Sequence, residues 1–176
     1  MFPKAHATAY VISAFRIAYY KVHYPSYFYA SWFSTKATDF DIESMIKGYD
    51  AIKARILEIT NKGFDASNKE TGILECLKLA LEMTARGIKF KNIDLNKSQA
   101  TTFCLDDDNN LIPPFTTIDG LGDTVAKTIV EERNKGSFLS VEDLQKRVKV
   151  SGTITEKIRN MNILEGLDES SQLSLF

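Results

Sequence analysis

The chain has 176 residues, 44% hydrophobic, 11% aromatic and 26% charged, and 22 basic against 23 acidic side chains give a net charge of −1. This composition is typical of a globular protein, and no apolar run is long enough to span a membrane. Polar residues interrupt the apolar N-terminal stretch, so we do not expect a signal peptide there. The cysteines Cys76 and Cys104 stand apart from each other and from both histidines, so neither a zinc site nor a disulfide framework is expected. We expect a cytoplasmic protein, and the charge balance alone argues against nucleic acid as a partner.

The first 35 residues are rich in aromatic side chains, and six of the seven tyrosines lie between Tyr10 and Tyr29. Apolar residues at helical spacing predict an amphipathic helix over residues 7–23. Pro25 is expected to end this helix, and Ser26 to cap a second, shorter one.

Two longer helices are expected next. Asp39 or Asp41 caps a helix whose isoleucines share one face and which ends at Gly63, where glycine suits a left-handed turn. Another helix runs from about Lys69 to Arg86.

The hydrophobic period then shortens, which predicts strands near residues 88–95, 101–105 and 111–112. The acidic run Asp106–Asp108, followed by two asparagines, predicts a turn between the last two strands. Short helices are expected again over residues 117–164. The predicted fold class is therefore mainly α with a small β element (α+β).

Residues Ile118–Lys127 hold two glycines in a tight turn that leads directly into a helix. Glycines let the backbone fold so that consecutive N–H groups point outward, and the helix start adds unpaired donors and a positive dipole end. Such a turn binds phosphate without net positive charge, and it resembles the helix-hairpin-helix motif of sequence-independent DNA-binding proteins. The candidate DNA contacts are Gly120, Leu121, Gly122, Asp123, Thr124 and Lys127.

A weaker copy is predicted 32 residues later, at Val150–Ile154, with Gly152 and Lys157 as candidate contacts. Ile154 stands where the pattern has its second glycine, so this copy either contacts DNA or only packs against the first. Two copies at this spacing resemble the tandem helix-hairpin-helix fold, whose paired motifs straddle the minor groove.

The chain ends in a short peptide with apolar anchors behind an acidic leader. This segment resembles the peptide with which bacterial polymerases and repair proteins bind the sliding clamp, the alternative being a frayed terminus. The candidate clamp-binding residues are Gln172, Leu173, Ser174, Leu175 and Phe176.

Residues 2–10 and the helix that follows resemble a segment of the bacterial C-family replicative DNA polymerases, the α subunits of DNA polymerase III. The order of motifs and the C-terminal clamp peptide are similar to the PolC type. The resemblance implies a C-terminal part of a DNA-directed DNA polymerase. The Mg²⁺-binding aspartates of such an enzyme lie in a palm domain outside this chain, so the chain has no catalytic residue, binds no cofactor of its own and is inactive alone.

The resemblance also implies partners: duplex DNA, the sliding clamp and, in the intact enzyme, a deoxynucleoside triphosphate. Lys4, His6 and Tyr10 are the candidate nucleotide contacts, although Tyr10 is equally suited to core packing. The implied parts are residues 1–64 in the fingers, 65–116 as their end or a connector, 117–165 as the tandem helix-hairpin-helix domain, and 166–176 as a flexible tail.

A second interpretation stays open at this point. A stand-alone helix-hairpin-helix adaptor that binds DNA and the clamp, with the first 86 residues as an interaction platform, carries the same two motifs. A helix-hairpin-helix glycosylase is disfavoured, because Asp123 and Lys127 are accounted for by the phosphate site.

Overall fold

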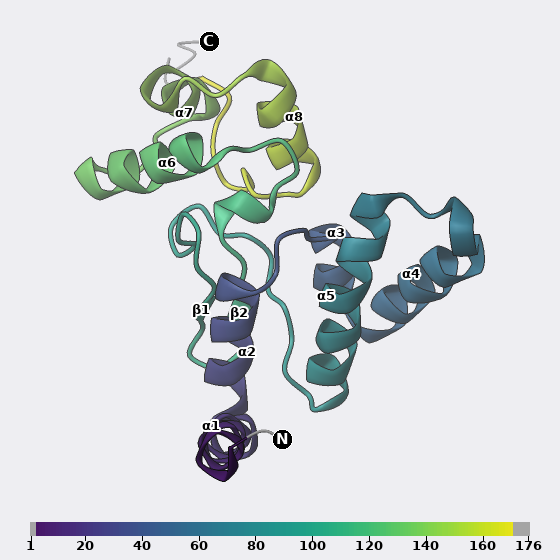
Figure 1. Cartoon of the computed structure of the whole chain (residues 1–176). Helices are drawn as coiled ribbons and strands as arrows, with labels where there is room; N and C mark the ends of the chain where they lie inside the picture. The colour runs from purple at the N-terminus through teal and green to yellow at the C-terminus, as the bar shows by residue number, and fades with distance from the viewer. Residues whose placement is uncertain (1–2, 171–176) are drawn as a thin grey trace.

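The computed structural model describes residues 3–170 and is mainly helical with one two-stranded antiparallel sheet, as the sequence predicts (Figure 1). No helix among these residues has the length and apolar character to cross a membrane. The helices are α1 (Lys4–His23), α2 (Pro25–Thr35), α3 (Ile42–Lys47), α4 (Tyr49–Lys62), α5 (Asn68–Ala85), α6 (Asp123–Lys135), α7 (Val141–Val148) and α8 (Gly152–Asn160); the strands are β1 (Cys104–Leu105) and β2 (Leu111–Ile112). Two 3-10 turns, η1 (Gly63–Asp65) and η2 (Phe115–Thr117), complete the fold.

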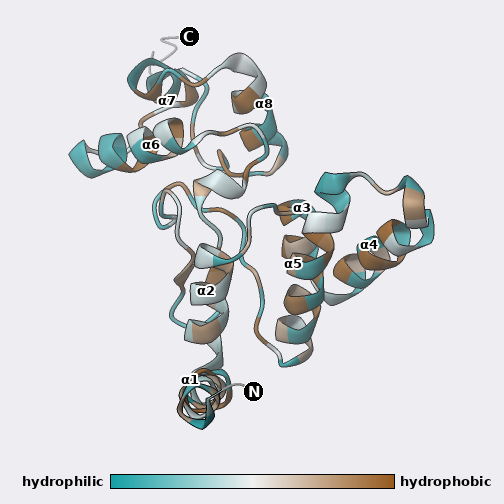
Figure 2. Ribbon diagram, in the orientation of Figure 1, coloured by the Kyte–Doolittle hydropathy of each residue, from teal (hydrophilic) through white to brown (hydrophobic). Residues whose placement is uncertain are grey.

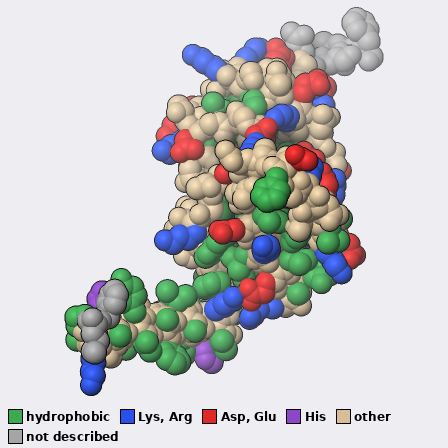
Figure 3. All heavy atoms as spheres, turned by 45° about the vertical axis from the view of Figure 1, so that its right-hand side comes forward, with side chains coloured by type: hydrophobic (Ala, Val, Ile, Leu, Met, Phe, Trp, Pro, Cys, Tyr) green, Lys and Arg blue, Asp and Glu red, His purple; other side chains and the backbone are tan. Residues whose placement is uncertain are grey.

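Helix α1 projects from the body as a solitary arm at the opposite end from α6–α8 (Figures 1 and 3). None of its residues is buried, and hydrophobic side chains cover it in Figure 3. Tyr10 does not pack in the core formed by the described residues, since its side chain is 67% exposed.

Helix α2 enters the core at once. Pro25 is the first residue of α2 and Tyr24 occupies its N-cap position, so the proline begins one helix as the other ends, and Ser26 lies buried inside α2 instead of capping it. The first turn tolerates proline because its N–H has no intrahelical partner there. Phe33 packs its ring against Phe90, with ring centroids 5.3 Å apart.

The predicted long helix after Asp41 is two helices. Asp41 caps α3 by accepting a hydrogen bond from the Ser44 amide, at 3.3 Å. Gly48 then adopts φ +93°, which breaks the helix before α4 begins. Helices α4 and α5 pack against each other as a helical hairpin, and α5 ends at Ala85, close to the predicted Arg86, with left-handed Gly87 two residues further on.

The strand predicted near residues 88–95 is wrong. Phe90 makes one isolated bridge to Leu111, and the Asp94 carboxylate accepts hydrogen bonds from the next amides, those of Asn96 and Lys97, which turns the chain. The expected turn at Asp106 is confirmed, because its Oδ1 accepts from the Asn110 amide at 2.8 Å and closes the β1–β2 connection.

Ile129, Leu144 and Ile158 of α6, α7 and α8 are buried and belong to the one hydrophobic cluster of the described residues, while the outer turns of α6 are hydrophilic (Figure 2). The first part of the predicted flexible tail contacts the body of the protein: the Val141 amide donates to the Asp168 carbonyl, and Arg159 pairs with Glu169 at 2.8 Å.

Candidate nucleic-acid interface

The first hairpin lies between η2 and α6, as the glycine pattern predicts. Gly120 has φ +86°, and a Cβ there would lie 3.4 Å from Ile154 Cδ1 of α8. Leu121 is buried at 5% exposure and anchors the turn. Gly122 is the N-cap of α6 and supplies no side-chain acceptor, so the first amides of α6 have no capping partner from it.

The second hairpin joins α7 to α8. Lys149 takes the left-handed conformation with φ +57°, Val150 is 9% exposed, and Ser151 is the N-cap of α8. These three positions repeat the backbone sequence of Gly120, Leu121 and Gly122: left-handed, then buried, then an extended N-cap.

Burial patterns fix the same register between the two helices that follow. Ala126 and Thr155 are 0% and 2% exposed, and Ile129 and Ile158 are 0% and 1% exposed. The predicted register, which placed Gly152 at the hairpin glycine, is therefore wrong. Gly152 is the first residue of α8, and the two glycine positions of the first hairpin correspond to Lys149 and Ser151.

The two helix starts differ in their free donors. Ser151 Oγ accepts a hydrogen bond from the Ile154 amide at 3.4 Å, whereas Gly122 caps nothing. The first hairpin therefore offers more unpaired backbone donors to an anion than the second.

Asp119 connects the two hairpins to the rest of the molecule. Lys157 of α8 donates to the Asp119 carbonyl at 2.9 Å and to its carboxylate at 3.1 Å, and Lys69 of α5 donates to the other carboxylate oxygen at 2.8 Å. Hydrogen bonds from Lys69 and then Lys157 hold the pKa of Asp119 below its usual value. The sequence pattern missed this Lys69–Asp119–Lys157 cluster, because its members come from three separate segments.

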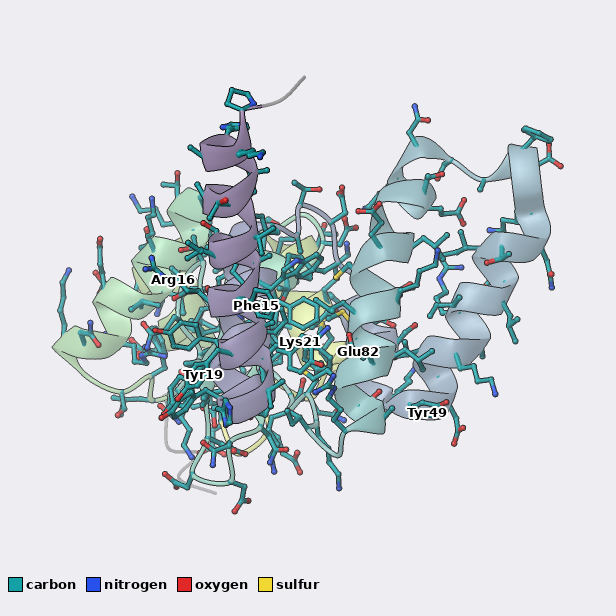
Figure 4. The ribbon with its side chains drawn as sticks, turned by 60° about the horizontal axis from the view of Figure 1, so that its bottom comes forward. Phe15, Arg16, Tyr19, Lys21, Tyr49 and Glu82 are labelled. Atoms are coloured by element: carbon teal, nitrogen blue, oxygen red, sulfur yellow. The ribbon has the colours of Figure 1, made fainter. Side chains whose placement is uncertain are left out.

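The three candidate nucleotide contacts lie on α1. Lys4 is the first residue of the helix, and the rings of His6 and Tyr10, one turn apart, meet edge to face with centroids at 4.6 Å. The far end of α1 is tied to the body by an ion pair between Lys21 and Glu82 of α5 at 2.8 Å (Figure 4). The clamp-peptide candidates, residues 172–176, lie outside the described residues.

The paired turns and the helices that follow them have the arrangement of the helix-hairpin-helix motif. A family model for the helix-hairpin-helix motif matches residues 87–173, which covers both hairpins.

Three curated relatives are named DNA polymerase III PolC-type, from Oceanobacillus iheyensis, Lactococcus lactis and Bacillus subtilis. They are 53%, 54% and 54% identical to the chain over all 176 of its residues. The chain spans 12%, 11% and 12% of their lengths, respectively. It therefore matches a segment of PolC-type DNA polymerase III from end to end, which confirms the resemblance to the bacterial C-family polymerases.

Proposed function

We propose that this chain is the part of a bacterial replicative DNA polymerase that holds the duplex product without regard to its sequence. The observation that carries the proposal is the first hairpin, where Gly120 in a left-handed turn precedes a helix start without a side-chain cap. The chain that contains this hairpin matches, over its full length, relatives named DNA polymerase III PolC-type.

The geometry supports a grip on the backbone of DNA. The first amides of α6 and the positive end of its dipole favour a phosphate oxygen, and Lys127, one turn further along, adds a cation. Contacts of this kind hold the sugar-phosphate backbone and read no base edge. A polymerase needs contacts that do not depend on base sequence, because its duplex product can have any sequence.

Duplex binding measured against salt concentration tests the proposal. The chain should bind two duplexes of unrelated sequence with equal affinity, and the logarithm of its binding constant should fall linearly with the logarithm of the salt concentration. Absence of binding at low salt, or a strong preference for one sequence, contradicts the proposal.

Gly120→Ala refines this test. A Cβ at a left-handed position strains the turn and crowds Ile154, so duplex affinity should fall by about tenfold, the equivalent of ~1.4 kcal/mol. Gly87→Ala is the matched control, because Gly87 has φ +88° and lies at the end of α5, away from both hairpins. Equal affinities of the two variants would overturn the role of the first hairpin.

The exposed helix α1 supports a role for residues 1–64 in the fingers. A helix with hydrophobic side chains on all sides is normally covered by other parts of a protein, and the relatives are far longer than this chain. In the intact polymerase, Lys4, His6 and Tyr10 would then lie at a helix start that favours triphosphate oxygens. His6→Ala in the full enzyme should raise KM for the nucleotide more than it lowers duplex affinity; an unchanged KM contradicts the role.

Residues 172–176 are proposed to bind the sliding clamp, on the strength of their sequence alone. Deleting these five residues should abolish co-purification with the clamp while the thermal unfolding midpoint of the chain stays the same. Retained clamp binding would show that another segment makes the contact.

A further inference from the structure

Most of the basic side chains of the hairpin region form contacts within the protein. Residues 117–165, all of which the structure describes, hold eight Lys and Arg residues. Six of them have protein partners: Arg133 with the Leu95 and Ser98 carbonyls, Lys135 and Arg147 with Glu132, Lys146 with Glu142, Lys157 with Asp119, and Arg159 with Glu169.

Two cations of this region have no ion pair or hydrogen bond among the described residues. One is Lys127 and the other is Lys149, and both are exposed. Lys127 lies one turn into α6, directly after the first hairpin, and Lys149 lies in the turn of the second. The distribution is therefore one unpaired cation for each hairpin.

The left-handed backbone conformation of Lys149 distinguishes it from an ordinary surface lysine. A left-handed conformation is unfavourable for any residue with a Cβ, and glycine is the residue that adopts it freely. The first hairpin has glycine at the equivalent position, Gly120. The second hairpin therefore has a long cationic side chain at a position where glycine, which has no side chain, would be more favourable for the backbone.

We infer that Lys149 is the phosphate-binding residue of the second hairpin, and that Lys157 is a positioning residue that fixes the two hairpins relative to each other. This inference rests on the proposed duplex binding. The two hairpins then hold DNA by different means. The first uses uncapped amides with Lys127, and the second, whose Ser151 already caps its own helix, uses the Lys149 ammonium.

This assignment also accounts for the charge of the region. Its eight basic residues are matched by eight acidic ones, so no general basic surface attracts DNA. A cation without a partner, placed at each turn, gives two local positive points in a segment of zero net charge, and each can release condensed counterions from a phosphate.

Two variants of the full chain separate the charge of Lys149 from the conformation of its turn. Lys149→Gly removes the charge and relieves the left-handed backbone, and Lys149→Asn removes the charge with a residue that tolerates this conformation. Both should reduce the salt slope of duplex binding by about 1 and weaken binding by about tenfold at 50 mM salt. The thermal midpoint of Lys149→Gly should equal or exceed that of the unaltered chain.

Lys53→Gln is the control, because Lys53 is an exposed lysine of α4 with no partner among the described residues and lies away from the hairpins. Its slope and affinity should match those of the unaltered chain. If the unaltered chain binds no duplex, the proposed function itself fails. If it binds and both Lys149 variants keep its slope and affinity, only the assignment of Lys149 is overturned.

Discussion

At Glu70, the third residue of α5, one carboxylate accepts three hydrogen bonds. Lys62 donates to Oε1 at 2.5 Å, and the Ser67 amide and hydroxyl donate to Oε2 at 3.0 and 3.1 Å. Ser67 in turn accepts from the Glu70 amide, which completes a capping box. These bonds, that of Lys62 first, lower the pKa of Glu70 to about 2.

The depressed pKa of Glu70 predicts a pH dependence of stability. A carboxyl whose pKa is lower in the folded chain stabilises it above its unfolded pKa, and this contribution is lost as the pH falls through the folded pKa. The difference in unfolding midpoint between the unaltered chain and Glu70→Gln should therefore shrink from about pH 5 down to about pH 2. Glu75→Gln, on the exposed face of the same helix, is the control. A difference that stays constant over this range contradicts the argument.

Single residues also show what a sequence pattern can predict. Gly120 was identified from sequence because glycine at a tight turn carries a conformational signal. Lys149 occupies the same backbone state without that signal, so the register of the second hairpin was misplaced by three residues. The local pattern favoured the visible glycine, Gly152, although burial of Val150 and capping by Ser151 decide the register. The burial of Val150 depends on tertiary packing and cannot be read from spacing alone, whereas the Ser151 cap is a local contact with the Ile154 amide that the residue type can indicate.

Among the elements, those with strong start and stop residues were predicted and those decided by tertiary contacts were not. Helix α5, with Ser67 before it and Gly87 after it, has nearly its predicted bounds. The division of α3 from α4 at Gly48 was missed, since an apolar face continues across it. The helical spacing predicts α1 correctly as a helix, but the prediction of an amphipathic helix with one buried face is wrong for this chain, because none of its residues is buried.

Helix α1 should be removable without unfolding the rest. It buries no side chain, and its Lys21–Glu82 pair is partly exposed, so its loss costs about 0–1 kcal/mol. Deleting residues 1–22 should shift the thermal midpoint by at most about 4 °C. The contrasting variant is Ile129→Ala, on the buried face of α6, which should lower the free energy of unfolding by about 2–5 kcal/mol. A deletion that unfolds the chain would show that α1 has a structural role.

The side chain of Arg133 connects helix α6 to the segment before β1. Arg133 donates to the Leu95 carbonyl at 3.0 Å and to the Ser98 carbonyl at 2.7 Å, and both of those residues are buried. Arg133→Ala leaves the two acceptors without this donor and should cost about 1.5–3 kcal/mol in a denaturant titration. Arg159→Ala removes a more exposed pair and should cost no more than about 1 kcal/mol. Equal losses of unfolding free energy in the two variants would show that water replaces the hydrogen bonds of Arg133 without a net cost.

At the scale of the whole molecule, many charged side chains form ion pairs within the protein. The net charge is −1, and the Lys69–Asp119–Lys157 cluster joins α5 to both hairpins, so two lysines near the turns hold protein together. Near-neutrality alone argues against nucleic acid. Under the proposed function, the zero net charge of residues 117–165 instead predicts a weak contact through the amides of the first hairpin with Lys127 and Lys149. We therefore expect the isolated chain to bind duplex weakly and the longer polymerase to bind it tightly.

The chain alone should not extend a primer. Nucleotide addition by a polymerase requires carboxylates that hold two Mg²⁺ ions. Among residues 3–170, no group of three or more His, Cys, Asp or Glu side chains gathers where it would hold a metal ion. The acidic run at Asp106–Asp108 is used in the β1–β2 turn, where Asp106 accepts from backbone amides and pairs with Lys91 at 3.4 Å. With primer-template, all four nucleotides and Mg²⁺, extension should stay at background while a gel-shift assay at low salt detects duplex binding. Extension that co-purifies with the chain and is lost in Asp106→Asn would place metal chemistry at this turn, and the separation between a binding segment and a catalytic one would then be wrong.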